Sequence, residues 1–112
     1  MGACDFQEVS YGKDLNDAFN RAFERANYEH GHDAYNGTIS TTSLKGIDHN
    51  APRYGTKAFY KYIDARYDTD GIKKWECYAV EVKGKALKEY RKRHHLERRK
   101  IKVYYFFGLA GC

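Results

Sequence analysis

The sequence predicts a single α+β domain with an about four-stranded antiparallel or mixed sheet and two to three helices packed mainly on one face. Its 112 residues suit one domain of the commonest size. Apolar residues recur at helical spacing over residues 15–26, whereas residues 75–82 alternate as in a strand. The expected order is strand–helix–strand, helix, strand–helix–strand, which favours a sheet covered by helices.

The first third of the chain is expected to form a strand, a helix and a second strand. Residues 3–10 alternate in polarity, as a half-buried strand does. Asp14 is placed to cap a helix whose apolar stripe faces the sheet and buries Phe19 and Phe23. Residues 37–44 are rich in Thr and Ser and suit a strand antiparallel or adjacent to the first.

The rest of the chain begins with a loop rich in glycine, asparagine and proline. Thr56 can cap a second helix that runs to about residue 67, although alternating tyrosines leave a strand open here. Residues 75–82 form a strand and residues 85–99 a third helix. Residues 101–109 are strongly apolar, which predicts a central strand.

Basic residues are concentrated near the end of the sequence. Residues 83–112 hold ten Lys and Arg against two acids, although the whole chain has a net charge of only +5. On a helix over residues 85–99, seven basic side chains share one face, namely Lys85, Lys88, Arg91, Lys92, His95, Arg98 and Arg99. Such a face can bind nucleic-acid phosphates, dock on an acidic protein, or serve only as a solvated surface. Tyr60, Tyr67 and Tyr104 are candidates to stack on bases.

A polar turn after the first helix carries the densest titratable chemistry. His30, His32 and Asp33, with His49 as a distant ligand, offer the donors that zinc or iron binds. His30, His32 and Tyr35 could instead serve acid–base chemistry in a metal-independent nuclease or hydrolase. The alternative is a purely structural role at a helix C-terminus, because imidazoles interact favourably with the negative end of the helix dipole. Because the histidines are two apart rather than four, we expect no metal and no cofactor. No nucleophile is paired with a base and no phosphate loop is present, so catalysis is expected less than binding.

The cysteines and the hydropathy bear on location. Cys4, Cys77 and Cys112 are scattered and form no CxxC pair, which argues against a disulfide scaffold or a zinc finger. We expect Cys4 and Cys77 to be small buried hydrophobes. No run approaches the ~20 apolar residues of a membrane span, and no charged-then-apolar leader opens the chain. The sequence therefore predicts a cytoplasmic protein without membrane contact.

The chain is rich in aromatic residues, with 11 Tyr and 6 Phe. Five large rings fall on predicted strands, namely Trp75, Tyr78, Tyr105, Phe106 and Phe107. If helices cover only one face of the sheet, the remaining rings form an adhesive patch or a homodimer surface. This pattern favours a binding function.

Several short motifs are similar to those of a protein family. They are a Gly-Ala-x-x-Phe start at residues 2–6, Tyr-Glu-His-Gly-His at 28–32, Gly-Thr-Ile at 37–39, and Phe-Phe-Gly-x-Ala at 106–110. In these the chain resembles a family of small uncharacterised proteins of bacteriophages and actinobacteria. The resemblance implies a phage or bacterial setting, and the family has no assigned activity. Its members turn tightly between their last two strands, where this chain has the basic helix.

The sequence as a whole predicts a small non-enzymatic binding protein, phage-encoded and acting on a host protein as an inhibitor or modulator in the host bacterial cytoplasm. One alternative is a nucleic-acid-binding protein that uses the basic helix of residues 85–99. The other is a small metal-independent nuclease or hydrolase centred on His30, His32 and Tyr35.

Overall fold

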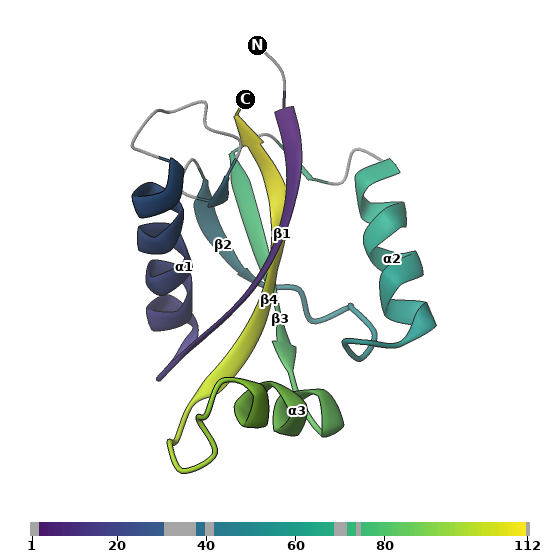
Figure 1. The fold of residues 1–112 in the computed structure, drawn as a ribbon. Helices are drawn as coiled ribbons and strands as arrows, with labels where there is room; N and C mark the ends of the chain where they lie inside the picture. The colour runs from purple at the N-terminus through teal and green to yellow at the C-terminus, as the bar shows by residue number, and fades with distance from the viewer. Residues whose placement is uncertain (1–2, 31–37, 40–41, 69–71, 74, 112) are drawn as a thin grey trace.

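The computed structural model describes residues 3–30, 38–39, 42–68, 72–73 and 75–111 (Figure 1). A four-stranded mixed sheet has the strand order β1-β4-β3-β2 and carries three helices, so the predicted fold class is confirmed. The elements are β1 (Ala3–Gly12), α1 (Leu15–His30), β2 (Ser43–Ile47), α2 (Lys57–Asp68), β3 (Glu76–Val82), α3 (Lys85–Arg93) and β4 (Lys102–Gly111).

β4 is central, as its apolar sequence predicts. It pairs with β1 on one side and β3 on the other, antiparallel in both cases. β2 overlaps the predicted strand of residues 37–44 only at Ser43 and Leu44 and pairs parallel with β3 at the far edge. The prediction that this strand lies antiparallel or adjacent to the first is therefore wrong. Parallel neighbours need a long crossover connection, and α2 lies in the segment that joins these two strands.

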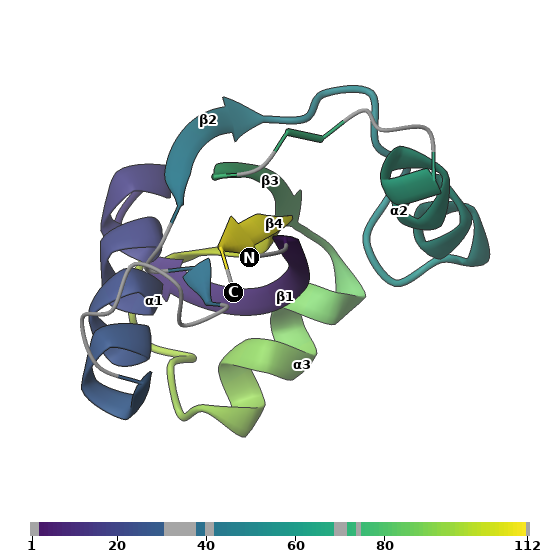
Figure 2. The ribbon, with the colours of Figure 1, turned by 90° about the horizontal axis from the view of Figure 1, so that it is seen from above.

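Helices cover both faces of the sheet. α1 packs on one face, and α2 and α3 pack on the other, so two of the three share a face (Figure 2). The face under α2 and α3 includes Tyr105 and Phe107, and the face under α1 includes Phe106. These three rings are 5%, 0% and 0% exposed. The expected bare aromatic face is therefore wrong, and a homodimer through it lacks the surface on which that prediction depended.

α1 begins as predicted, because the Asp14 carboxylate accepts a hydrogen bond from the Asp17 backbone N–H at 2.9 Å. The side chains it buries completely or nearly so are small, namely those of Ala18, Ala22 and Ala26. Phe19 and Phe23 are only half-buried, contrary to the prediction. Alanines let the helix approach the strands closely, which displaces the two larger rings to the flank of the contact.

Two glycines are needed for close approach of the backbone. A Cβ at Gly12 would lie 2.5 Å from the Ala18 backbone nitrogen, where β1 meets the first turn of α1. A Cβ at Gly108 would lie 2.0 Å from the Glu76 carbonyl oxygen, where β4 meets the start of β3. Any larger residue at either position would push the two elements apart.

α2 is a helix rather than the alternative strand. Its Thr56 cap accepts a hydrogen bond from the Phe59 N–H at 3.1 Å. The buried Asp48, just after β2, pairs with Arg66 of α2 and accepts a hydrogen bond from the Tyr62 hydroxyl at 2.7 Å. The Arg66 guanidinium in turn lies 4.9 Å from the centre of the Tyr78 ring. No local sequence pattern indicates this network, which joins the loop after β2, α2 and β3.

Within the described residues, no helix has the length and apolar character needed to cross a membrane.

The two cysteines predicted to be small buried hydrophobes differ in the structure. Cys77 is buried and free as predicted, and burial raises the pKa of its thiol to about 12. Cys4, however, forms a disulfide, so its prediction as a simple buried hydrophobe is wrong. A disulfide is typical of oxidising compartments and counts against the reducing environment inferred from the cysteine count.

Candidate binding surface

α3 ends at Arg93, six residues earlier than predicted. His95 adopts a left-handed conformation with φ of 56°. The Leu96 N–H donates to the Arg91 carbonyl at 2.8 Å, and the His95 N–H donates to the Lys92 carbonyl at 3.3 Å. These two bonds form a Schellman motif, the usual end of a helix. Leu96 is buried, so burial of one apolar side chain accompanies the turn.

The early end of α3 divides the predicted basic face between two elements. Lys85, Lys88 and Lys92 are exposed on the helix, whereas His95, Arg98 and Arg99 are exposed in the turn that follows it. Helical spacing therefore does not describe how the side chains of the second group are arranged. We call the exposed basic side chains of this region the basic end; they are Lys85, Lys88, Lys92, Arg93, His95, Arg98, Arg99 and Lys100.

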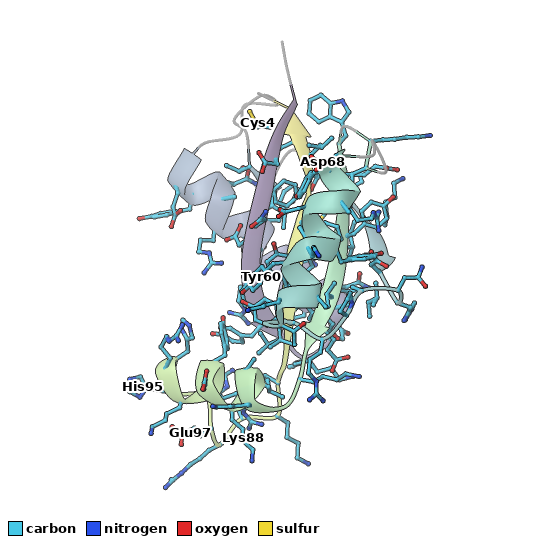
Figure 3. The ribbon with its side chains drawn as sticks, turned by 90° about the vertical axis from the view of Figure 1, so that its right-hand side faces the viewer. Cys4, Tyr60, Asp68, Lys88, His95 and Glu97 are labelled. Atoms are coloured by element: carbon cyan, nitrogen blue, oxygen red, sulfur yellow. The ribbon has the colours of Figure 1, made fainter. Side chains whose placement is uncertain are left out.

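The basic end lies at one extremity of the molecule. Figure 3 places Lys88, His95 and Glu97 at the α3 extremity, and Cys4 and Asp68 at the opposite one. Arg93 and Lys100 were missed because a helix over residues 85–99 turns Arg93 away from the basic face and stops before Lys100. The concentration of charge, rather than its periodicity, was the signal that could have found them.

Arg91 has a different role from its basic neighbours. Its side chain is half-buried, and the guanidinium donates hydrogen bonds to the Glu97 carbonyl at 2.9 Å and the Arg99 carbonyl at 2.7 Å. Arg91 therefore fixes the turn that presents Arg98 and Arg99. The basic end is therefore defined without Arg91.

The opposite side of α3 packs on the sheet. Ala86, Leu87 and Tyr90 contact the core cluster under α2 and α3. His94 is exposed, and its ring lies 4.2 Å from that of Tyr90. The basic end is thus held on a helix whose other side is anchored.

The tyrosines expected to stack on bases are poorly placed for that task. Tyr104 is buried under α1. The Tyr67 hydroxyl lies 3.1 Å from the Phe6 and Gly108 carbonyl oxygens and accepts a hydrogen bond from the Gly108 N–H at 3.1 Å. Burial raises the Tyr67 pKa to about 12. Tyr60 is 52% exposed, but it lies on α2 rather than on the basic end.

The histidine turn falls mostly outside the described residues. This applies to His32, Asp33 and Tyr35, and to the side chain of His30, whose backbone ends α1. His49 is exposed in the loop after β2. Over the part of the chain that is described, no group of three or more His, Cys, Asp or Glu could hold a metal ion. The metal and nuclease hypotheses stay predictions, which elemental analysis and nuclease assays of the purified protein would test.

No protein-family model, no curated protein and no solved structure matches this chain. The resemblance to small phage and actinobacterial proteins accordingly stays an expectation.

Proposed function

We propose that this is a small non-enzymatic binding protein that docks its basic end on an acidic host protein and inhibits or modulates it. The observation that carries the proposal is the concentration of exposed basic side chains on α3 and the turn after it. A surface of one charge sign speeds encounter with a partner of the opposite sign and selects against wrong partners.

The basic end is also held in a fixed shape. The two hydrogen bonds of the Arg91 guanidinium and the buried Leu96 fix the turn, and Tyr90 anchors the helix. A partner therefore does not have to order this segment on binding, and that reduces the entropic cost of association.

An acidic protein is preferred to nucleic acid for two reasons. Tyr67 and Tyr104 are poorly placed to stack on bases, because Tyr104 is buried under α1 and the half-buried Tyr67 bonds through its hydroxyl to β4. Glu89 and Glu97 are exposed among the basic residues, which suits a partner of mixed charge better than a continuous row of phosphates.

Nucleic acid is the second candidate, and the high local density of Lys and Arg favours it. Phosphate contacts release condensed counterions, so charge alone can supply nonspecific affinity.

The proposal also includes an origin and a compartment: the protein is phage-encoded and acts in the bacterial cytoplasm. The disulfide at Cys4 bears on the compartment, because disulfides are typical of oxidising environments.

The test is capture of partners from host lysate by the purified protein, with and without nuclease. The key variant reverses four exposed charges of the basic end, Lys88→Glu, Lys92→Glu, Arg98→Glu and Arg99→Glu. The matched control makes the same change in net charge at exposed positions elsewhere, Lys13→Glu, Lys45→Glu, Lys57→Glu and Lys61→Glu.

We expect the key variant to lose its partner and the control to keep it. For an acidic protein, capture should survive nuclease, and added salt should mainly slow association. For nucleic acid, nuclease should remove the bound material, and the logarithm of the affinity should fall linearly with the logarithm of salt concentration. Equal loss in both variants, or in neither, would show that the basic end is only a solvated surface.

A further inference from the structure

A hollow of about 340 Å³ lies between the inner side of α3 and the body of the protein. Four elements line it: α3, β1, β3 and α1, together with the loop before α2. Its volume is within the range of pockets that bind small molecules. On α3 it is lined by Ala86, Glu89, Tyr90 and Arg93, which follow helical spacing and form one stripe.

The hollow offers both apolar and aromatic contact. Val9 of β1, Val82 of β3 and Ala86 contribute aliphatic groups. Tyr54 and Tyr90 contribute rings that other contacts already hold in place. The Tyr54 ring lies 5.4 Å from that of Tyr105. Fixed rings beside aliphatic groups favour a flat aromatic ligand.

Charged groups also line the hollow. The Arg25 guanidinium is held by Glu8 at 2.6 Å, so its position is set before any ligand arrives. The Arg93 side chain, one helical turn from Glu89, is exposed and lines the hollow. The His94 imidazole stacks beside it on Tyr90. Arg93 thus brings one positive charge of the basic end to the hollow, while Glu8 already pairs with Arg25.

We propose that this hollow binds a small aromatic acid, with its ring among Tyr54, Tyr90 and the aliphatic groups and its anionic group on Arg93. The site does not depend on the proposed docking function, because the hollow faces the body of the protein and Arg93 is the one residue of the basic end that lines it. Guanidinium groups bind carboxylates through paired donors, which orients the ligand.

The test uses the full chain and follows backbone and side-chain resonances of Val82, Ala86 and Tyr90 by NMR. Indole-3-acetate is the probe, since it combines a ring with a carboxylate. Acetate removes the ring, and tryptamine replaces the negative charge by a positive one. We expect saturable shifts with indole-3-acetate at a dissociation constant on the order of 1 mM. Acetate and tryptamine should give no saturable shift at these positions.

Three variants test the assigned contacts. Arg93→Ala should weaken indole-3-acetate binding by about threefold to fivefold, whereas Lys92→Ala, which removes the same charge outside the hollow, should change it by less than about twofold. Ala86→Leu should fill the hollow and abolish binding. Glu89→Gln removes an exposed negative charge and should strengthen binding by about twofold.

Four results would each overturn the site. They are no saturable shift up to about 10 mM, equal affinity for tryptamine and indole-3-acetate, equal loss in Arg93→Ala and Lys92→Ala, and retained affinity in Ala86→Leu with a well-dispersed spectrum. Should Ala86→Leu fail to fold, weaker binding by Glu89→Gln decides against the site instead, because that exposed substitution leaves the packing intact.

Discussion

At the scale of single residues, the structure is held by polar side chains that bond to the backbone. Tyr67 reaches from α2 to the Gly108 N–H in β4, and Arg91 reaches from α3 to two carbonyls of the turn after it. The amino-acid composition predicts neither of these hydrogen-bonding roles. A buried donor left without its partner costs about 1–3 kcal/mol, so each side chain stabilises the fold mainly by preventing that loss.

Tyr67→Phe is the direct test at this scale. At neutral pH it should lower the free energy of unfolding by about 1–3 kcal/mol, because the Gly108 N–H loses its acceptor. Denaturant unfolding measures this change. A free energy equal to that of the unmodified protein would contradict the assigned bond.

The same variant has a distinct pH dependence. Burial raises the pKa of Tyr67 from its ordinary 10.0 to about 12, so between these values the native state binds more protons than the unfolded state. The stabilisation is complete below pH 10 and is lost as the pH rises through 12. Stability should therefore fall less steeply over this window in Tyr67→Phe than in the unmodified protein. Identical slopes would show that the hydroxyl is not buried as described.

At the scale of the elements, the end of α3 decides how the charge is presented. A helix that continued to Arg99 would place the basic side chains on one straight face. The Schellman turn at His95 and Leu96 instead folds the later ones back over the end of the helix. Leu96 is buried and its neighbours are charged, so apolar burial outweighs the helix propensity of the flanking residues.

His95→Gly tests this turn. The left-handed conformation is strained for residues with a Cβ, so glycine should raise the free energy of unfolding by about 0.5–1 kcal/mol. His94→Gly is the matched control, because His94 has an ordinary φ of −101° and stacks on Tyr90. It should lower the free energy of unfolding. Thermal melting compares the two, and destabilisation of both variants to the same extent would contradict the turn.

At the scale of the whole molecule, the sheet is built outward from β4. That strand has a partner on each side, and its rings lie under helices on both faces. β2 is a short edge strand with an irregular register between Leu44 and Gly46. Structure that is paired and covered on every side opens only with global unfolding, whereas an edge opens locally.

The rate of native-state hydrogen exchange should therefore differ between the strands. We expect the slowest amides in the centre of β4, around Tyr105 and Phe106, and the fastest strand amides in β2. Exchange followed by NMR at neutral pH would measure both. Equal protection of β2 and β4 would contradict the assigned strand order.

The amino-acid sequence alone predicts the elements whose pattern is local. Asp14 and Thr56 mark the starts of α1 and α2, and the apolar run of residues 101–109 identifies the central strand. It also located the basic residues near the end of the chain, because charge density needs no geometry to detect.

How these elements meet cannot be predicted from local patterns, because it depends on tertiary packing. The parallel pairing of β2 with β3, the helices on both faces and the Asp48–Arg66 pair are contacts between distant segments, which no local period encodes. The same is true of the surface. Burial of Leu96 ended α3 at Arg93, and packing of Ala86 and Tyr90 against the sheet left the hollow beside it. Side chains compete for a limited interior, and the outcome depends on every element that borders it.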